Sequence, residues 1–182
     1  MAVNYNNIII CLLVLVISSA CTAAISQENS NDELVGHLKM RVAAATKKLG
    51  DTIQECEAVA ASGGEIRISI DSPAIQSSTR EQLMTGLAHL YFHNQRKCEQ
   101  AARAALAYEI QTLIFIKKKY GYDTGDLVEA SEVLLLPSRK ELAYELEYQR
   151  LPEELTAQLE KDIGGAPFSL KTLEEQGVLA VD

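Results

Sequence analysis

The sequence predicts a mostly all-α protein, a compact helical bundle with at most one short strand pair and one disulfide. Alanine, leucine and glutamate are plentiful, and only four of the 182 residues are proline, a composition that favours helices. Apolar residues recur every three or four positions through long stretches, as on one face of an amphipathic helix. Hydrophobic residues make up 47% of the chain and charged residues 23%, which is typical of a globular domain.

The N-terminal segment is apolar and carries no charged side chain through residue 27. Ten apolar residues follow one another from Ile8 to Ile17, and small residues come next. As a helix, ten residues rise about 15 Å, half of the hydrocarbon core of a bilayer. A short apolar run followed by small residues is typical of an export signal, so we predict a signal peptide over residues 1–20.

The stretch ISSAC, Ile17 to Cys21, resembles the lipobox of bacterial lipoproteins, in which the cysteine is lipidated and becomes the mature N-terminus. Ser19 and Ala20 fit the positions before that cysteine. Ser18 stands where a leucine is usual, and no Lys or Arg precedes the apolar run. The resemblance implies a lipid anchor at Cys21 and an exported, membrane-anchored protein facing the periplasm. The polar stretch Ser26 to Asp32 is typical of a short tether, so residues 21–31 are predicted to form the lipidated N-terminus and a polar tether.

Two other outcomes stay open for this segment. Cleavage after Ala20, Ala23 or Ala24 would give a soluble periplasmic or secreted protein, and an uncleaved segment would stay as an anchor. All three place the folded part outside the cytosol, as a single helical domain over residues 32–182.

The first predicted helix of the domain runs from about Asp32 to Ala61, with Asn31 as its cap and Gly63-Gly64 after its end. Its apolar stripe recurs at three-, four- or seven-residue steps, and Cys56 lies near the centre of that stripe. The members of the stripe are Leu34, Leu38, Val42, Ala45, Leu49, Ile53, Cys56 and Ala60.

A second helix opens at the capping box Ser78 to Glu81. At Asn94-Gln95 the chain either turns or continues into the next helical pattern, Arg96 to Tyr120. Cys98 lies near the middle of the apolar stripe of that pattern. Gly121 suits a left-handed helix cap, and Lys117 to Lys119 complement the dipole of the last turn.

Cys56 and Cys98 are the two cysteines outside the signal and its border, an even number in an oxidising compartment. Because each faces a core from its own helix, we predict a disulfide between them. Closing a loop of this length stabilises the fold by about 4 kcal/mol in the chain-entropy model. The alternative is two buried free thiols.

The C-terminal third predicts shorter elements. They are a helix capped by Asp123-Thr124 and running to about Leu134, a helix from the capping box Ser138 to Glu141 to about Arg150, a helix with Pro152 in its first turn ending near Gly164, and a last helix from Ser169 to Gln176.

One strand is also predicted. Glu65 to Asp71 alternates isoleucines with polar residues, and Val178 to Val181 is the candidate partner. Without that partner the strand edge would be open to another chain.

His89 and His93 have the i, i+4 spacing of two metal ligands on one helix. On a helical wheel they point away from the apolar face, and their neighbours offer no third ligand. Those neighbours are Gln82, Gly86, Arg96 and Lys97. We therefore predict two surface histidines and no metal site.

Glu109 lies among apolar residues of its helix and is the candidate buried acid. It marks either a functional site or a carboxylate paired with a cation or emerging at a helix crossing. The sequence carries no nucleophile elbow, Gly-rich phosphate loop or haem-attachment motif, so no cofactor is predicted and an enzyme is disfavoured. A net charge of −8 disfavours nucleic-acid binding.

The leading hypothesis is a non-catalytic accessory protein of the cell envelope that binds another envelope protein. In size, anchor, helical content and single disulfide it is similar to secretion pilotins, immunity proteins and inhibitors of enzymes. The alternatives are a carrier of a small apolar ligand and a cell-wall hydrolase that uses carboxylates.

Overall fold

A computed structural model describes the backbone of residues 5–62, 66–121, 127–175 and 178, and most side chains from residue 33 onward. Within these residues the fold is all-α, as the sequence predicts. The helices are α1 (Tyr5–Ser62), α2 (Pro73–Gln76), α3 (Arg80–Tyr120), α4 (Leu127–Leu135), α5 (Arg139–Tyr148), α6 (Glu153–Ile163) and α7 (Leu170–Glu175).

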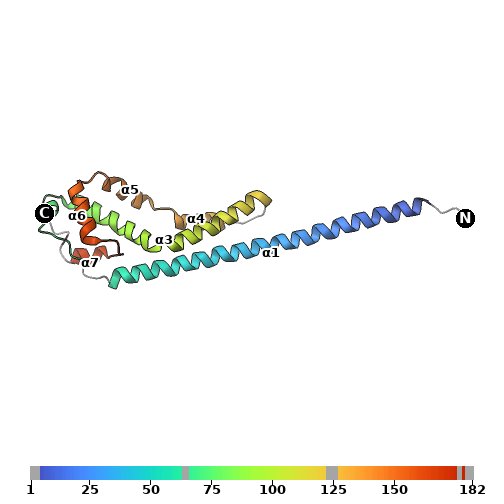
Figure 1. The fold of residues 1–182 in the computed structure, drawn as a ribbon, viewed down its shortest axis with the longest axis horizontal. Coiled ribbons are helices and arrows are strands. Elements are labelled where there is room, and N and C mark those ends of the chain that lie inside the picture. Colours follow the sequence, from blue (N-terminus) through green and yellow to red (C-terminus); the bar gives the residue numbers. More distant parts are fainter. Residues whose placement is uncertain (1–4, 63–65, 122–126, 176–177, 179–182) are drawn as a thin grey trace.

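Two long helices form the frame of the molecule. α1 and α3 lie side by side and antiparallel along most of α3, and α1 continues beyond the end of α3 towards the N-terminus (Figure 1). α4 and α5 run back along α3, while α6 and α7 gather at the far end of the hairpin (Figure 1).

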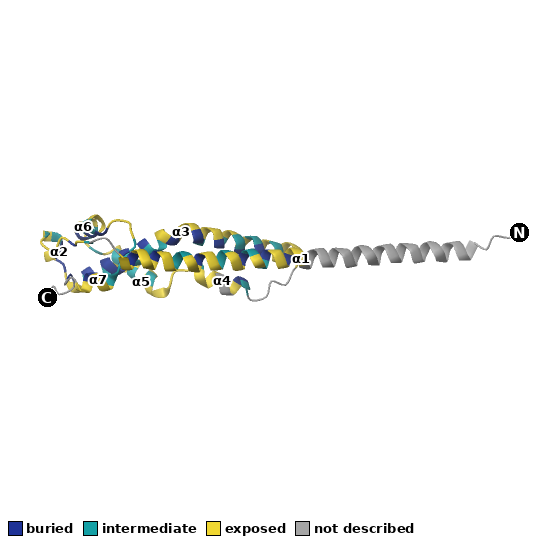
Figure 2. Ribbon diagram, turned by 90° about the horizontal axis from the view of Figure 1, so that it is seen from below, coloured by how far each residue is buried: buried dark blue, intermediate teal, exposed yellow. Residues whose placement is uncertain are grey.

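The contact between α1 and α3 contains one apolar cluster, which we call the hairpin core. Its side chains recur at helical spacing on both helices, so that two stripes face each other (Figure 2). Val128 of α4 closes the cluster from the side. The buried members are Leu38, Val42, Leu49, Ala102, Leu106, Ile110, Leu113 and Val128.

A second cluster, the head core, fills the far end of the molecule. The first turns of α3 supply its base, and α2, α6, α7 and the segments between them cover it. Phe168 is its largest fully buried side chain. The buried members are Ile68, Ile75, Leu83, Leu87, Leu90, Leu155, Leu159, Ile163, Phe168, Leu173 and Val178.

α3 continues without a turn at Asn94-Gln95, which settles the alternative left open by the sequence. Asn94 is 1% exposed, and its side-chain amide donates to the carbonyls of Gly164 and Ala166 at 3.0 and 2.9 Å. The polar residue in mid-helix therefore serves a tertiary contact with the end of α6 and does not mark a break.

The capping residues of α3 differ from the prediction by one position. Thr79, not Ser78, is the N-cap, and Gln82 completes the capping box in place of Glu81. Ser78 is buried and donates instead to the carbonyl of Ala74 at 2.6 Å. At the other end Gly121 adopts the predicted left-handed conformation, with φ 73°.

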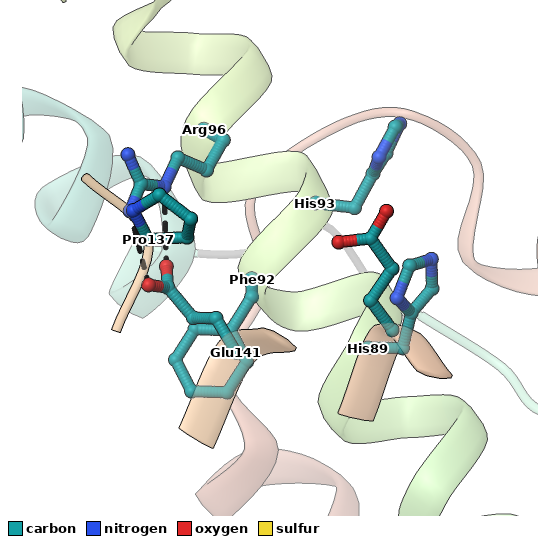
Figure 3. Close-up of a pocket in the computed structure, with 7 residues that line it drawn as sticks. His89, Phe92, His93, Arg96, Pro137 and Glu141 are labelled. Atoms are coloured by element: carbon teal, nitrogen blue, oxygen red, sulfur yellow. Dashed lines mark hydrogen bonds and ion pairs between the residues drawn. The ribbon is translucent and has the colours of Figure 1, made fainter. Parts of the chain in front are cut away.

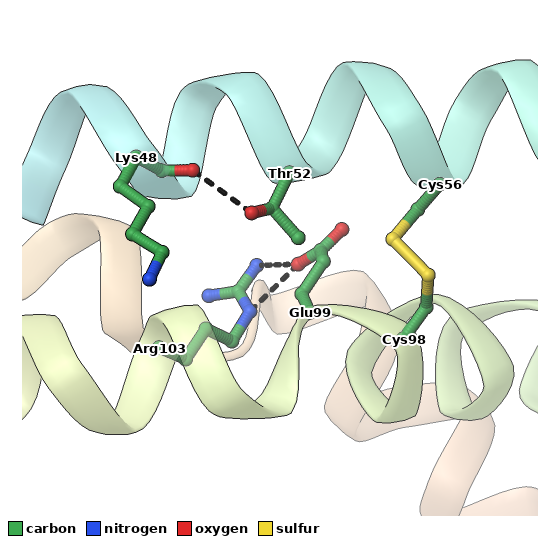
Figure 4. The surroundings of a disulfide bond; sticks show 6 residues. All are labelled: Lys48, Thr52, Cys56, Cys98, Glu99 and Arg103. Carbon is green, nitrogen blue, oxygen red and sulfur yellow. Dashed lines mark hydrogen bonds and ion pairs between the residues drawn. A yellow bond between two sulfur atoms is a disulfide. The ribbon is translucent and has the colours of Figure 1, made fainter.

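The disulfide between Cys56 and Cys98 is present and joins α1 to α3 between the two cores (Figure 4). The Cα atoms are 6.1 Å apart, and Cys56 is 1% exposed. Cys98, in contrast, is exposed, so its predicted place in the middle of the stripe is wrong. The buried residues of α3 at this level are Asn94, Glu99 and Ala102.

α1 begins earlier than predicted. It is helical from Tyr5, so Asn31 lies inside the helix and does not cap it. No glycine or proline occurs before Gly36, and nothing in that stretch forces the helix to stop. The predicted signal peptide, lipidation site and tether fall on residues 1–31, whose side chains lie outside the described residues.

The predicted strand is absent from the described part of residues 65–71. Residues 66–69 form neither helix nor strand within the described residues, and the carboxylate of Asp162 on α6 binds Ser69 at the end of this segment. It accepts from the backbone N–H of Ser69 at 2.7 Å and from its hydroxyl at 3.1 Å. Of the candidate partner Val178 to Val181 only Val178 is described, and its N–H donates to the Leu173 carbonyl at 3.2 Å; the rest lies outside the described residues.

The shorter helices follow the predicted order. The capping box of Ser138 and Glu141 opens α5, and Pro152 stands immediately before α6. α7 lies within the predicted last helix. The predicted Asp123-Thr124 cap lies outside the described residues, and α2 was not predicted.

Candidate functional site on α5

α5 turns its polar side to the protein and its leucines to solvent. The side chains that face α3 are Glu141, Tyr144 and Tyr148, which recur at three- and four-residue steps. Leu142 and Leu146 lie on the opposite side and are 50% and 52% exposed. A helix packed by burial of its apolar face would have the reverse orientation.

Exposed apolar residues continue from α5 back to the end of α4. We call this set the leucine surface. Its members are Val133, Leu134, Leu136, Leu142 and Leu146, which are between 42% and 70% exposed. Isolated exposed leucines are ordinary, whereas a concentration of them within one short stretch is typical of an interaction site.

An ion pair fixes the start of α5. The guanidinium of Arg96 on α3 donates to both carboxylate oxygens of Glu141, at 3.1 and 3.0 Å (Figure 3). It also donates to the carbonyls of Leu135 and Leu136, at 3.0 and 2.9 Å. One side chain of α3 thus holds both the end of α4 and the start of α5, and with them the backbone beneath the leucine surface.

The pKa of Glu141 reflects this environment. Burial raises it, but hydrogen bonds from Arg96 and from the N–H and hydroxyl of Ser138 outweigh burial, so the pKa lies below its ordinary value. Glu141 therefore stays ionised and paired at neutral pH.

Aromatic contacts hold the rest of α5. Tyr148 stacks on His89 with ring centroids 4.0 Å apart, and Tyr144 stacks on Phe92 at 6.1 Å. The Tyr148 hydroxyl donates to Glu160 on α6 at 2.9 Å, so α3, α5 and α6 meet at this tyrosine. Burial and Glu160 together raise the pKa of Tyr148 far above its ordinary value, so it remains a hydrogen-bond donor.

A groove of about 310 Å³ opens between α3 and α5 (Figure 3). Its lining combines charged and polar groups with apolar surface. The residues that line it are His89, Phe92, His93, Arg96, Pro137, Glu141 and Glu145.

The two histidines are not equally exposed, in contrast to the helical-wheel prediction. His93 is exposed, but α5 half-buries His89. The wheel considered α3 alone, whereas the folded chain adds Glu145 from α5 and Glu160 from α6 to the surroundings of His89. Burial and the neighbouring His93 lower the pKa of His89, although both carboxylates oppose the shift. Within the described residues, no three His, Cys, Asp or Glu side chains are placed to hold a metal ion.

Glu109 makes the cation contact that was the alternative to a functional role. Its carboxylate lies 2.9 Å from the guanidinium of Arg41 on α1, beside the hairpin core. The pair also raises the pKa of Arg41. The contact joins the two long helices and is far along α3 from the groove of His89.

Glu109 is only half-buried, and the acid that is buried among the described residues, Glu99, was not predicted from the sequence. Glu99 is 5% exposed and accepts from Arg103, one turn later on α3, at 2.7 Å (Figure 4). Arg103 also donates to the carbonyl of Leu134, at the edge of the leucine surface. The i, i+4 spacing of an acid and a base was the available signal for this pair.

Arg96 and Arg103 lie seven residues apart on one face of α3 and hold the same segment by its carbonyls. The end of α4 and the start of α5 are thus fixed by polar contacts to α3, which leaves their apolar side chains available to a partner.

Comparison of the chain with protein-family models, with curated proteins and with solved structures found no match. Within the described residues, no helix is both long enough and apolar enough to span a bilayer.

Proposed function

We propose that this protein is a non-catalytic accessory protein of the cell envelope that binds another envelope protein through the leucine surface. The observation that carries the proposal is the orientation of α5, with polar and aromatic residues against α3 and leucines in solvent. Full burial of a fully exposed leucine is worth roughly 1.5–3 kcal/mol, and each of these half-exposed leucines would gain about half of that, so covering this surface favours a complex.

The leucine surface is also well fixed for binding. Arg96 and Arg103 hold its backbone, and the stack of Tyr148 on His89 holds the last turn of α5. A surface that is ordered before binding loses less conformational entropy in the complex.

The grooves of the described residues favour protein binding over a carrier of an apolar ligand. The groove between α3 and α5 has charged side chains in its lining, Arg96, Glu141 and Glu145. A neighbouring groove, also of about 310 Å³, contains Lys97, Asn94 and Glu160. An apolar ligand would need a lining with few charges.

Site-specific photo-crosslinking in the native host tests this proposal. A photoreactive residue at Leu142 or Leu136 should give one discrete crosslink to an envelope protein. The same residue at Val59, which is exposed to 49% on α1, should not give that product. Equal products from all three positions, or none from the leucine surface, would argue against a binding site there.

A matched pair of variants extends the test. Leu142→Glu/Leu146→Glu should abolish the crosslink from Leu136, whereas Val59→Glu should leave it unchanged. Because all three side chains are exposed, stability should change by no more than about 0.5 kcal/mol in either variant.

We also propose export and lipid anchoring at Cys21. Two features support this: the lipobox-like ISSAC stretch and the disulfide, since disulfides persist mainly in oxidising compartments. Mass spectrometry of the mature protein is the test. A diacylglyceryl-modified Cys21 as the first residue supports the anchor, and an unmodified N-terminus after Ala23 or Ala24 excludes it.

A further inference from the structure

The last turns of α3 carry an exposed group of aromatic and basic residues, which we call the hairpin tip (residues 115–120). Phe115 and Tyr120 are 58% and 51% exposed, and Lys117, Lys118 and Lys119 are exposed between them. The Lys119 ammonium lies 5.6 Å from the ring centroid of Phe115 and 5.2 Å from that of Tyr120. The rings and the cation thus form one surface.

The hairpin tip lies at the end of the molecule from which α1 continues to the N-terminal apolar run. α1 passes beside the tip and extends beyond it, while the head core lies at the opposite end (Figure 1). Between Cys21 and Glu33 the chain rises about 18 Å as a helix. A tilt of the hairpin is therefore enough to bring the tip to a surface in which Cys21 is anchored.

Charge is distributed unevenly between the two ends. Residues 33–48 and 105–120, which pack together, contain seven Lys or Arg and two Glu, a net charge of +5. Residues 121–135 add four acids, so these three segments together carry a net charge of +1. Because the whole chain carries −8, all other residues together carry −9. The nearest described acid on α3, Glu109, is paired with Arg41.

We propose that the hairpin tip lies on the headgroup layer of an anionic phospholipid bilayer, with Lys117 to Lys119 on lipid phosphates and the Phe115 ring in the interface. Lysines are attracted to anionic leaflets, and their alkyl stems pack on apolar surface while the ammonium stays in the headgroups. Aromatic rings prefer the same depth. This surface is separate from the leucine surface, and its nearness to a bilayer rests on the anchoring proposed at Cys21.

The lysines also complement the dipole of α3, and that role is compatible with lipid contact. Dipole complementation by itself requires neither the exposed ring of Phe115 nor the gathering of cations at the end nearest the apolar segment. Lipid contact explains the three lysines, the exposed ring of Phe115 and the position of both at this end of the molecule.

The chain contains no tryptophan, so Phe115→Trp introduces a single fluorescent reporter at the tip. The full chain is added to vesicles of phosphatidylethanolamine mixed with phosphatidylglycerol, whose surface is anionic. We expect the tryptophan emission to shift to shorter wavelength and acrylamide quenching to fall. Neither should occur with phosphatidylcholine vesicles. A Leu142→Trp reporter on α5, at similar exposure, should remain unchanged with both.

Replacing Lys117, Lys118 and Lys119 by glutamine in the Phe115→Trp chain should remove the emission shift. Each lysine lost should lower the equilibrium constant for contact with the bilayer by about fivefold. Replacing the same three by arginine should keep it. Circular dichroism establishes that both variants are folded. An unchanged Phe115→Trp emission on anionic vesicles, or a shift that survives the glutamine variant, would overturn the proposal.

Discussion

The hairpin core and the head core consist of the same kinds of apolar side chain, but they are assembled differently. The hairpin core is mainly the contact of two long helices whose stripes repeat with the helical period. The head core gathers side chains from α2, α3, α6, α7 and the segments between them, and no single periodic pattern contains them all. Periodic sequence therefore specifies the first core directly, whereas the second depends on long-range packing.

A polar layer lies between the two cores. Asn94 and Glu99 are buried there, and the disulfide crosses from α1 to α3 at the same level (Figure 4). Buried polar groups stabilise only when their partners are present, so this layer makes the position of α6 relative to α3 specific. Substitutions in the polar layer and in each of the two regions should therefore have different effects on stability.

The largest expected effect is that of removing the disulfide, which joins α1 to α3 between the two cores. Cys56→Ser/Cys98→Ser should lower the free energy of unfolding by about 4 kcal/mol, because the disulfide restricts a loop with a sequence separation of 42 in the unfolded chain. Urea denaturation measures it, and reduced wild-type protein should match the variant. A loss below about 1 kcal/mol would mean that the link contributes little to either core.

Removing the side-chain amide of Asn94 should lower the free energy of unfolding by about 1–3 kcal/mol. Asn94→Ala leaves the carbonyls of Gly164 and Ala166 without their buried donor. Hydrogen exchange should show the loss in α6 before α1. Equal loss throughout the chain would indicate that the two cores unfold as one unit.

Two glycine-to-alanine substitutions, one beside the head core and one on α1, should change the free energy of unfolding in opposite directions. A Cβ at Gly86 would lie 2.4 Å from Cδ1 of Leu159 in the head core, so Gly86→Ala should destabilise by about 1–3 kcal/mol. A Cβ at Gly50 on α1 would meet no atom within 4 Å, so Gly50→Ala should stabilise by about 1 kcal/mol through helix propensity. Thermal unfolding followed by circular dichroism compares the two, and the same sign for both would contradict the packing described for Gly86.

The smallest effect concerns pH. Folding lowers the pKa of His89 below its ordinary 6.5, chiefly by burial and then by the charge of His93. Between the folded value and 6.5 the unfolded chain binds more protons, so stability rises with pH in that window. The contribution is fully present above 6.5 and is lost as the pH falls through the folded value.

Urea midpoints at pH 7.5 and 5.5 test the His89 contribution. His89→Gln should reduce the difference between them, whereas His37→Gln on α1 should keep the wild-type difference. If His89→Gln leaves the pH dependence unchanged, burial of His89 under Tyr148 does not contribute to it.

Local signals predicted much of the fold. The capping box of Ser138 and Glu141 and the left-handed Gly121 follow from neighbouring residues. The pairing of Cys56 with Cys98 follows from their being the two cysteines outside the apolar N-terminal segment and its border. The predicted strand at residues 65–71 was wrong because Asp162, nearly a hundred residues later, supplies the acceptor that a neighbouring strand would have supplied. No local pattern contains that contact.

The site was less predictable than the fold. The sequence marked Glu109 and the histidine pair, but not the contacts of Arg96, Glu99 or Arg103. The two arginines bind carbonyls and a carboxylate that lie 31 to 45 residues further along the chain. These partners come within reach only when α4 and α5 pack on α3.

The sequence by itself determined the helical class, the hairpin stripes and the pair of cysteines that joins them, because helical phase is a property of neighbouring residues. The tertiary structure alone decided which side of α5 faces water. Burial of Leu142 and Leu146 would be favoured locally, but the Arg96–Glu141 pair and the stacking on His89 place the other side against α3. The leucines are therefore left to a partner because contacts distant in sequence determine the orientation of the helix.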